Sequence, residues 1–388
     1  MADPPPVFPP EEFRARTARL QATMARHGID ALLLTTPWDL FYVTGFLTRF
    51  WESPARPWFV IVPSGADPVA VIPEIGADLM RRTWLTDIRT WPAPDPRDDG
   101  VTLLADTLAA LVPDGGRIGL PMGAESHLRM PLADYQRLTA VLAGRDFTDA
   151  TATIRQVREV KSEAEIALIR AACSIAGRAF DRVPDIARPG TPLSRVFRDF
   201  QAALLQEGAD WVAYLAGGAG PGGYGDVISP ADDRPLREGD VLMLDTGAVH
   251  RGHFCDFDRN FAIGAPAPAV QRAHAALVAA TDHVLLALRP GMTAREVHAR
   301  LFARLRDAGL TPLGGRLGHG LGLTLTEWPS FSPLDDTPLR AGMVLTLEPG
   351  VELEPGRILV HEENLVLREN GAELLSPPAP AVMPVIGP

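Results

Sequence analysis

Two pairs of acidic residues, each divided by a turn, are the first candidates for chemistry in this sequence. Asp245 follows the apolar run 241–244, Asp256 lies beyond a His-Arg-Gly turn signal, and apolar residues flank both acids. This pattern predicts a strand, a turn and a second strand. If the turn is centred between His250 and Arg251, the two carboxylates face each other, with Cβ atoms roughly 5 Å apart. Because facing buried carboxylates repel, we expect a cation between them.

A second hairpin repeats this arrangement. Glu348 and Glu362 are equidistant from Pro355, which lies in a Glu-Pro-Gly turn, so these two acids are also expected to face each other. Between the hairpins lies His319, a potential metal ligand, flanked by glycines that allow close backbone approach. Four carboxylates and one imidazole suit divalent ions such as manganese, cobalt, iron or zinc. Two carboxylates per hairpin favour a two-metal site that bridges a hydroxide.

The order of these motifs resembles the pita-bread metallopeptidases, which include methionine aminopeptidase, Xaa-Pro aminopeptidase, prolidase and creatinase. The matching motifs are Asp245, Asp256, Gly-His319-Gly, Leu-Glu348-Pro-Gly and His-Glu362-Glu. The resemblance runs from about Val157 to the C-terminus, and residues 39–46 are similar to the first-domain signature of the prolidase and creatinase branch. It implies an α/β creatinase-like N-terminal domain over residues 1–155 and an α+β pita-bread catalytic domain over residues 156–388. It also implies a homodimer.

The same resemblance implies a role for each ligand. Asp245 and Asp256 hold one ion, and Asp256 shares the second ion with His319, Glu348 and Glu362. Glu348 takes a proton from the bridging water and passes it to the leaving nitrogen.

Substrate contacts are expected from two loop-like segments. In two-domain members of the family, the first domain of one subunit reaches the partner's active site, so three residues are candidate contacts supplied in trans: Arg49, Trp51 and Arg56. A packed surface loop is the alternative for this segment. Tyr224 lies in the glycine-rich stretch 215–226, which lacks the Lys-Ser/Thr of a nucleotide-binding loop and is expected to line the pocket.

The positions that handle the peptide depart from the family pattern. Peptide-cleaving members carry histidine or arginine where this chain has Ile228, Gly315, Thr326 and Val360. Those groups contact the scissile amide and the developing oxyanion, and removal of one such donor typically lowers the rate about 100- to 1000-fold. Thr326 keeps a hydroxyl donor and is a candidate catalytic residue, whereas Ile228 and Val360 bring no donor to the substrate. Asp258, often threonine in the family, is expected to orient Arg259 or to contact a metal.

Composition limits the class of protein. A length of 388 residues favours two domains, and the net charge of −11 argues against a nucleic-acid or anionic membrane surface. Two cysteines suggest no disulfide framework and fit a cytoplasmic protein. The N-terminus lacks a signal-peptide pattern, and no apolar run approaches the roughly 20 residues that span a membrane.

Apolar periodicity and turn residues predict the main elements. Ser162 and Glu165 form a capping-box signature at the start of the second domain. Helices are predicted over 10–27, 74–84, 100–111, 162–183, 193–207, 273–288 and 294–308, and first-domain strands over 31–35, 58–62, 68–72 and 117–120.

Three functions follow in order of preference. The first is a two-metal hydrolase of the Xaa-Pro peptidase type that cleaves a dipeptide or a small peptide-like amide. The second is a relative retooled, as creatinase is, for a small non-peptide substrate, because the peptide-handling positions differ. The third is a non-catalytic binding protein on the same fold, which five retained ligands disfavour.

Overall fold

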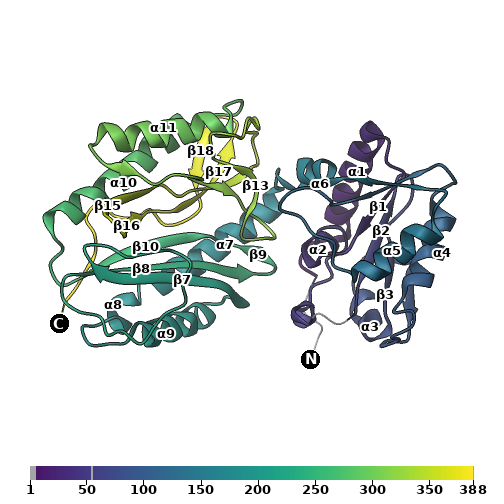
Figure 1. Ribbon diagram of the computed structural model, residues 1–388, viewed down its shortest axis with the longest axis horizontal. Helices are drawn as coiled ribbons and strands as arrows, with labels where there is room; N and C mark the ends of the chain where they lie inside the picture. The colour runs from purple at the N-terminus through teal and green to yellow at the C-terminus, as the bar shows by residue number, and fades with distance from the viewer. Residues whose placement is uncertain (1–5, 54–55, 388) are drawn as a thin grey trace. The chain divides into compact units, whose positions relative to one another are not determined.

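The computed structural model describes residues 6–53 and 56–387, and the chain divides into two compact units, Met1–Arg158 and Glu159–Pro388. The units are coloured purple to blue and teal to yellow in Figure 1. In the described part of the chain, no helix has the length and apolar character needed to cross a membrane.

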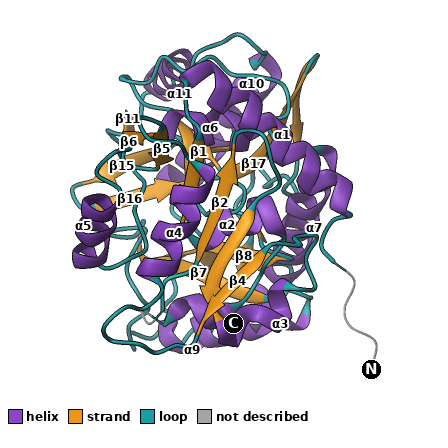
Figure 2. Ribbon diagram, turned by 90° about the vertical axis from the view of Figure 1, so that its right-hand side faces the viewer, coloured by secondary structure: helices purple, strands orange, loops and turns teal. Residues whose placement is uncertain are grey.

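The first unit is built on a six-stranded mixed sheet (Figure 2). The strand order is β4-β3-β2-β1-β5-β6. The central strands β1, β2 and β3 pair antiparallel, whereas β4, β5 and β6 join in parallel. The strands are β1 Ala31–Leu34, β2 Phe59–Pro63, β3 Val69–Pro73, β4 Ile88–Trp91, β5 Arg117–Leu120 and β6 Asp146–Asp149. Strands β1 to β3 are buried along their whole length, as expected for strands covered on both faces.

Helices alternate with these strands and give the predicted α/β architecture. They are α1 Pro10–His27, α2 Pro37–Thr44, η1 Arg49–Glu52, η2 Glu74–Gly76, α3 Ala77–Met80, α4 Val101–Leu111, α5 Leu132–Val141 and α6 Thr151–Arg158. Helix α1 ends at Gly28, whose φ of 63° is the left-handed conformation of a C-cap. The single helix predicted over residues 74–84 is wrong, because this stretch forms only η2 and the one-turn α3.

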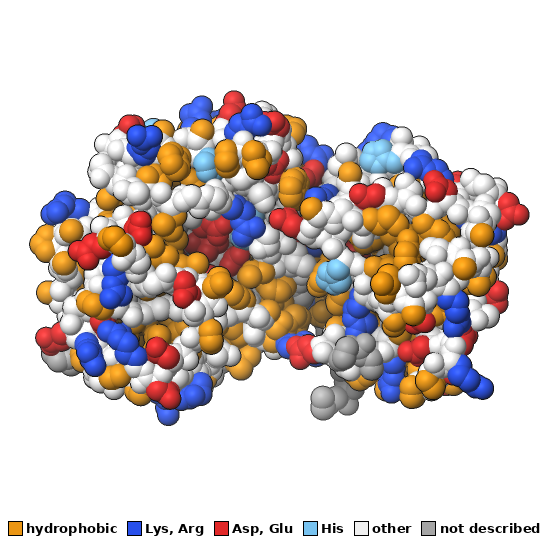
Figure 3. Space-filling view, viewed as in Figure 1, with side chains coloured by type: hydrophobic (Ala, Val, Ile, Leu, Met, Phe, Trp, Pro, Cys, Tyr) orange, Lys and Arg blue, Asp and Glu red, His pale blue; other side chains and the backbone are white. Residues whose placement is uncertain are grey.

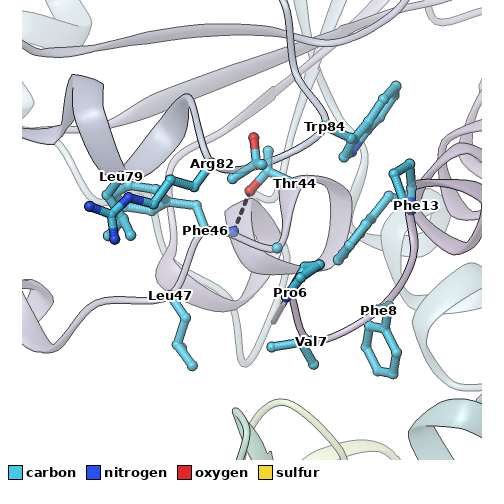
Figure 4. Close-up of a pocket in the computed structure, with 13 residues that line it drawn as sticks. Pro6, Val7, Phe8, Phe13, Thr44, Phe46, Leu47, Leu79, Arg82 and Trp84 are labelled. Carbon is cyan, nitrogen blue, oxygen red and sulfur yellow. Dashed lines mark hydrogen bonds between the residues drawn. The ribbon is translucent and has the colours of Figure 1, made fainter. Parts of the chain in front are cut away.

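An aromatic corner of the first unit leaves an apolar cavity of about 520 Å³ (Figure 4). Phe8, Phe13, Phe46 and Trp84 line it, and the Phe46 amide donates to the Thr44 hydroxyl at 2.9 Å. Gly45 ends α2 beneath Phe13, where an added Cβ would lie 2.7 Å from the ring. Glycine is therefore required at this helix end.

The second unit contains two larger sheets and one small sheet (Figure 1). Their strands pair antiparallel, except that β19 joins β10 in parallel. One sheet has the order β19-β10-β8-β7 with β9 paired to β8, and the other has the order β13-β12-β14-β17-β18. The small sheet is β11-β15-β16. The strands are β7 Trp211–Pro221, β8 Asp240–His250, β9 His253–Phe254, β10 Phe257–Ile263, β11 Thr311–Pro312, β12 His319–Gly320, β13 Glu327–Ser330, β14 Val344–Leu347, β15 Gly350–Glu354, β16 Arg357–Val360, β17 Glu363–Arg368, β18 Gly371–Leu374 and β19 Val385–Ile386.

Helices cover each half of this α+β unit. They are α7 Glu163–Phe180, α8 Val183–Ile186, α9 Leu193–Gln206, α10 Pro268–Ala287 and α11 Ala294–Asp307. Helices α7 and α9 share a core with β8, through residues such as Ile169, Phe200 and Leu244. Helices α10 and α11 share another with β14, through residues such as Leu301 and Leu345. The strand hairpins that carry the acids therefore lie on a packed, rigid scaffold.

The predicted capping box at the start of α7 is confirmed. The Ser162 hydroxyl accepts from the Glu165 amide, and the Glu165 carboxylate accepts from the Ser162 amide at 3.0 Å. Thr293 and Glu296 form the same box at the start of α11. Each box satisfies backbone donors that the first helical turn leaves unpaired.

Candidate metal centre

The register of the first hairpin differs from the prediction. Strands β8 and β9 are joined by Arg251 and Gly252, which both have positive φ (48° and 83°), as in a two-residue type I′ turn. The turn is therefore centred one residue later than predicted, and Asp245 faces Asp258 instead of Asp256. The predicted facing of Asp245 and Asp256 is wrong.

Asp256 lies in the short gap between β9 and β10, where Asn364 of β17 holds its backbone. The Asp256 amide donates to the Asn364 side-chain oxygen at 2.8 Å, and the Asn364 amide group donates to the Asp256 carbonyl. Asp256 is 3% exposed. This clamp joins the two acid-bearing hairpins and fixes where the Asp256 carboxylate can lie.

The register of the second hairpin agrees with the prediction. Leu347 pairs with Glu363 on one side, and Gly350 pairs with Val360 on the other. Continuing this register between the two pairs places Glu348 opposite Glu362. Glu362 is 4% exposed, whereas the Glu348 side chain is 22% exposed, so Glu348 is the more accessible of the two acids.

His319 stands in β12 with its ring orientation fixed. Gly318 before it has φ 145°, and an added Cβ there would meet the Thr346 carbonyl at 2.4 Å. The His319 Nδ1 lies 2.8 Å from the Gly320 carbonyl, so Nδ1 must carry the proton and donate it. The Nε2 atom of the same ring faces Asp256 Oδ2 at 3.4 Å and Glu348 Oε2 at 3.7 Å.

These side chains form a buried group of the kind that binds cations. One ligand atom each from Asp256, His319 and Glu362 lie within 4.8 Å of one another. Asp245 Oδ1, Asp258 Oδ2 and Glu362 Oε1 are buried without a hydrogen-bond partner. Figure 3 shows acidic side chains gathered in a hollow of the second unit. Acceptors that face one another without donors fit a bound cation, so the residues suit divalent metal ions.

Comparison with known proteins identifies the family. A model described as metallopeptidase family M24 matches residues 167–369, and a model of the creatinase/prolidase N-terminal domain matches residues 16–160. The chain belongs to metallopeptidase family M24. It is therefore a metal-dependent hydrolase with a creatinase-type N-terminal domain and a pita-bread catalytic domain, as the sequence predicts.

Relatives of this M24 chain cover nearly its full length. It is 32% identical to the probable dipeptidase PepE of Mycobacterium tuberculosis over 94% of both chains, and 24% identical to the Xaa-Pro dipeptidase of Pyrococcus horikoshii over 91% of this chain and 94% of the relative. The crystal structure of dipeptidase PepE from Mycobacterium ulcerans is similar, with 30% identity, a TM-score of 0.84, and coverage of 98% of this chain and 99% of that one.

Burial and mutual repulsion raise the pKa values of the acids in the M24 site. Burial and then the charge of Glu348 raise the pKa of Asp245 to about 7. Burial, followed by neighbouring carboxylates, also raises the pKa of Asp256 and of Glu362 well above the usual range. The folded, metal-free site therefore holds protons that the unfolded chain releases.

We expect the stability of the metal-free protein to fall as pH rises. A carboxyl whose pKa is raised on folding favours the folded state below its unfolded pKa and loses that contribution as pH rises through its folded value. For Asp245 this window runs from 3.8 to about 7, which corresponds to roughly 4 kcal/mol. Urea unfolding of chelator-treated protein at pH 5 and pH 8 measures the effect, and Asp245→Asn is expected to flatten it. Greater stability of the chelated protein at pH 8 would contradict this account.

The Asp258 carboxylate does not orient Arg259, which reaches only the Asp258 backbone carbonyl, through Nη1. Its Oδ1 accepts from the Glu362 amide at 2.7 Å, and its Oδ2 is one of the unpartnered buried oxygens. Arg259 instead donates through Nη2 to Glu363 at 2.9 Å. Asp258 thus belongs to the acidic group, facing Asp245, and its contact with a metal stays a prediction.

Tyr224 and Val360, two predicted substrate positions, form hydrogen bonds within the protein. Tyr224 is 1% exposed, and its hydroxyl donates to Asn260 at 3.1 Å and accepts from the Val360 amide at 2.7 Å. The prediction that Tyr224 contacts substrate is therefore wrong, and most of its glycine-rich stretch is strand β7, not a loop. Val360 lies in β16 and supports this network through its backbone.

The remaining positions that depart from the family pattern are exposed or half-buried. Ile228 is 77% exposed, and Gly315 is also exposed. Thr326 is half-buried in the turn before β13, where its carbonyl accepts from the Thr324 hydroxyl at 2.8 Å. Contact of Ile228 or Thr326 with substrate stays a prediction.

The loop predicted to act in trans is packed within the first unit. Arg49 pairs with Glu52 inside η1, and the Trp51 ring lies 5.5 Å from that of Trp58. The Arg56 guanidinium lies over Phe50 at 5.6 Å. A contact of Arg49, Trp51 or Arg56 with substrate stays a prediction.

A buried ion pair that the sequence pattern does not predict holds the turn that contains Thr326. Lys161, the single lysine of the chain, lies 3.0 Å from Glu327, and these side chains are 2% and 8% exposed. The Glu327 carboxylate also accepts from the amides of Leu323 and Thr324. The sequence feature that points to this ion pair is Lys161 itself, a single lysine close to the domain boundary.

Replacing Lys161 by methionine is expected to destabilise the protein by roughly 3–5 kcal/mol, because Glu327 is left as an uncompensated buried charge. Urea unfolding at pH 7 measures this loss. The double variant Lys161→Met/Glu327→Leu is the matched control and should be clearly more stable than the single variant. Equal destabilisation in both variants would show that the charge is not the cause.

Proposed function

We propose that this M24 protein is a cytoplasmic dipeptidase of the Xaa-Pro type that works with two divalent ions. The supporting observation is the His319 ring, whose Nε2 faces two carboxylates across 3.4 and 3.7 Å with Glu362 beside them. Asp245 and Asp256 would hold one ion, and Asp256 would share the other with His319, Glu348 and Glu362. Manganese, cobalt, iron and zinc suit this set of ligands.

Glu348 is the residue proposed to move the proton. When bound, the ions lower the pKa of a water molecule and polarise the scissile carbonyl. The Glu348 carboxylate, more accessible than Asp256 and Glu362, accepts a proton from the attacking water and returns it to the leaving nitrogen. Thr326 is proposed to donate a hydrogen bond to the substrate from its turn.

A dipeptide substrate is supported by the relatives, which include proteins named dipeptidase PepE and Xaa-Pro dipeptidase. A homodimer, in which Arg49, Trp51 and Arg56 of one subunit reach the site of the other, is part of the proposal. Size measurement in solution tests the dimer.

A second candidate is a creatinase-like enzyme for a small non-peptide substrate. It is favoured by Ile228 and Val360, which bring no side-chain donor where peptide-cleaving members carry one. Metal analysis of anaerobically purified protein, followed by a panel of Xaa-Pro dipeptides, other dipeptides and small amides, separates the two. Bound metal with no turnover of any dipeptide would overturn the first proposal and favour the second.

A further inference from the structure

Asp258 adds a carboxylate to the acidic group at a position often occupied by threonine in the family. It pairs with Asp245 in the register of β10 and β8, and directly opposed residues share one face of a sheet, with Cβ atoms roughly 5 Å apart. A threonine hydroxyl could donate a hydrogen bond to Asp245. An ionised aspartate offers only acceptors, so this chain has a second acceptor where a donor would satisfy the first.

The two oxygens of the Asp258 carboxylate differ in their surroundings. The residue is 1% exposed, and its Oδ1 accepts from the Glu362 amide at 2.7 Å. This bond joins Asp258 to the group of ligand atoms from Asp256, His319 and Glu362. The Oδ2 atom is buried without a hydrogen-bond partner, and so is Asp245 Oδ1. The first oxygen therefore orients the carboxylate, while the second remains an unsatisfied acceptor.

The pair of Asp245 and Asp258 lacks the compensation that the more exposed acid has. Arg316 Nε donates to Glu348 Oε1 at 3.3 Å, whereas Asp245 and Asp258 each keep an oxygen without a donor. Burial, followed by the charge of Asp245, raises the pKa of Asp258 well above its usual range. Buried carboxylates that face each other in this way are costly unless a cation or a proton joins them.

The ligand sets of the proposed function leave the first ion with few protein ligands. The second ion has four such ligands, whereas the first has only Asp245 and Asp256. Manganese favours an octahedral set of oxygen ligands, whereas zinc is most often four-coordinate and accepts nitrogen or sulfur ligands. A third carboxylate at the first ion therefore favours a manganese-like ion over zinc at that position.

We propose that Asp258 is a metal ligand that joins Asp245 and Asp256 at the first ion and biases this position toward manganese. The inference rests on the proposed two-ion function and deepens it, because it adds a ligand and names the class of ion. In the competing arrangement, Asp258 and Asp245 share a proton, and the metal ions do not contact Asp258.

Metal binding tests this inference without any turnover. Metal-depleted wild type, Asp258→Asn and Asp258→Thr are titrated calorimetrically with Mn²⁺ and with Zn²⁺, and bound ions are counted by elemental analysis. Loss of an outer-shell partner typically weakens metal binding 10- to 100-fold, so loss of a ligand should raise the Kd of one manganese ion at least tenfold. Zinc binding should weaken less, so the ratio of the two Kd values shifts toward zinc.

The matched control is Asp240→Asn. Asp240 is also a buried aspartate of β8, but its carboxylate accepts from Arg234 Nη2 at 2.8 Å and from the Arg237 amide at 2.9 Å. Its acceptors are thus satisfied within the protein. This variant should bind both metals as the wild type does, even if its stability is lower.

Thermal unfolding gives a readout that a merely structural acid would not produce. Asparagine at position 258 keeps an oxygen for the Glu362 amide and can place an amide donor opposite Asp245. Metal-free Asp258→Asn should therefore unfold at least about 2 °C above the metal-free wild type at pH 8. Saturating Mn²⁺ should raise the Tm of the wild type by more than that of the variant, because the variant lacks a ligand.

The outcomes separate this inference from the proposed function. Manganese Kd values within threefold of the wild type in both Asp258 variants, with the same number of bound ions, would overturn the inference and favour the shared proton. A lower Tm of metal-free Asp258→Asn would also overturn it. If the metal-loaded wild type cleaves no peptide or amide, the proposed function fails, and the Kd values still decide the role of Asp258. A wild type that binds no metal would overturn both.

Discussion

Replacing Glu348 by glutamine is expected to lower kcat for an Xaa-Pro dipeptide by roughly 100- to 10,000-fold, the range typical of a positioned acid–base group. Glutamine keeps the size of the side chain but cannot accept and return a proton. Because the Glu348 side chain is 22% exposed, the substitution should leave the fold intact. Steady-state kinetics with metal analysis of the same samples measures the effect.

The matched control for this variant is Glu354→Gln. Glu354 is an exposed acid at the turn end of β15 in the same hairpin, and its loss should leave kcat unchanged. If Glu348→Gln binds both ions and keeps more than a tenth of the wild-type kcat, Glu348 is not the proton carrier. If Glu348→Gln loses an ion, the fall in kcat reflects the loss of a metal ligand and not the loss of the proton carrier.

Removal of the metal ions is expected to abolish turnover. A chelator such as 1,10-phenanthroline should reduce activity to background, and added manganese or cobalt should restore it, because carboxylates cannot polarise the scissile carbonyl as a metal ion does. His319→Ala should weaken ion binding and reduce turnover even at saturating metal. Titration calorimetry and activity assays follow both effects.

The control for the histidine variant is His283→Ala, at an exposed position on α10. It should bind metal as the wild type does. Full turnover in thoroughly metal-depleted protein, verified by elemental analysis, would refute the metal-dependent chemistry of this site and leave the buried acids without an explanation.

The two hairpins show what the sequence could and could not predict. In the second, a symmetric Glu-Pro-Gly turn gave the register of Glu348 and Glu362 directly. In the first, the turn type decided the register: Arg251 and Gly252 both take positive φ, and only a two-residue type I′ loop centred on them explains this. This turn lies one residue later than the sequence pattern predicts, and it pairs Asp245 with Asp258.

The run of glycines before Tyr224 predicts a loop, but much of this run belongs to strand β7. At Gly217, an added Cβ would lie 2.1 Å from the Met243 carbonyl of the neighbouring strand. These glycines serve close strand packing, which composition alone does not distinguish from flexibility. Likewise, Arg316 and Asn364 meet the acids only through tertiary structure, because each is far in sequence from the residue it contacts.

The three unpartnered buried oxygens have a consequence beyond the reaction itself. Asp245, Asp258 and Glu362 each keep an acceptor that only an ion or a proton satisfies. An ion that binds the native state and not the unfolded chain shifts the folding equilibrium by mass action. In a cell starved of transition metals, the polypeptide would open more often and be digested sooner. Its abundance, and not merely its specific activity, would then follow the supply of the ion.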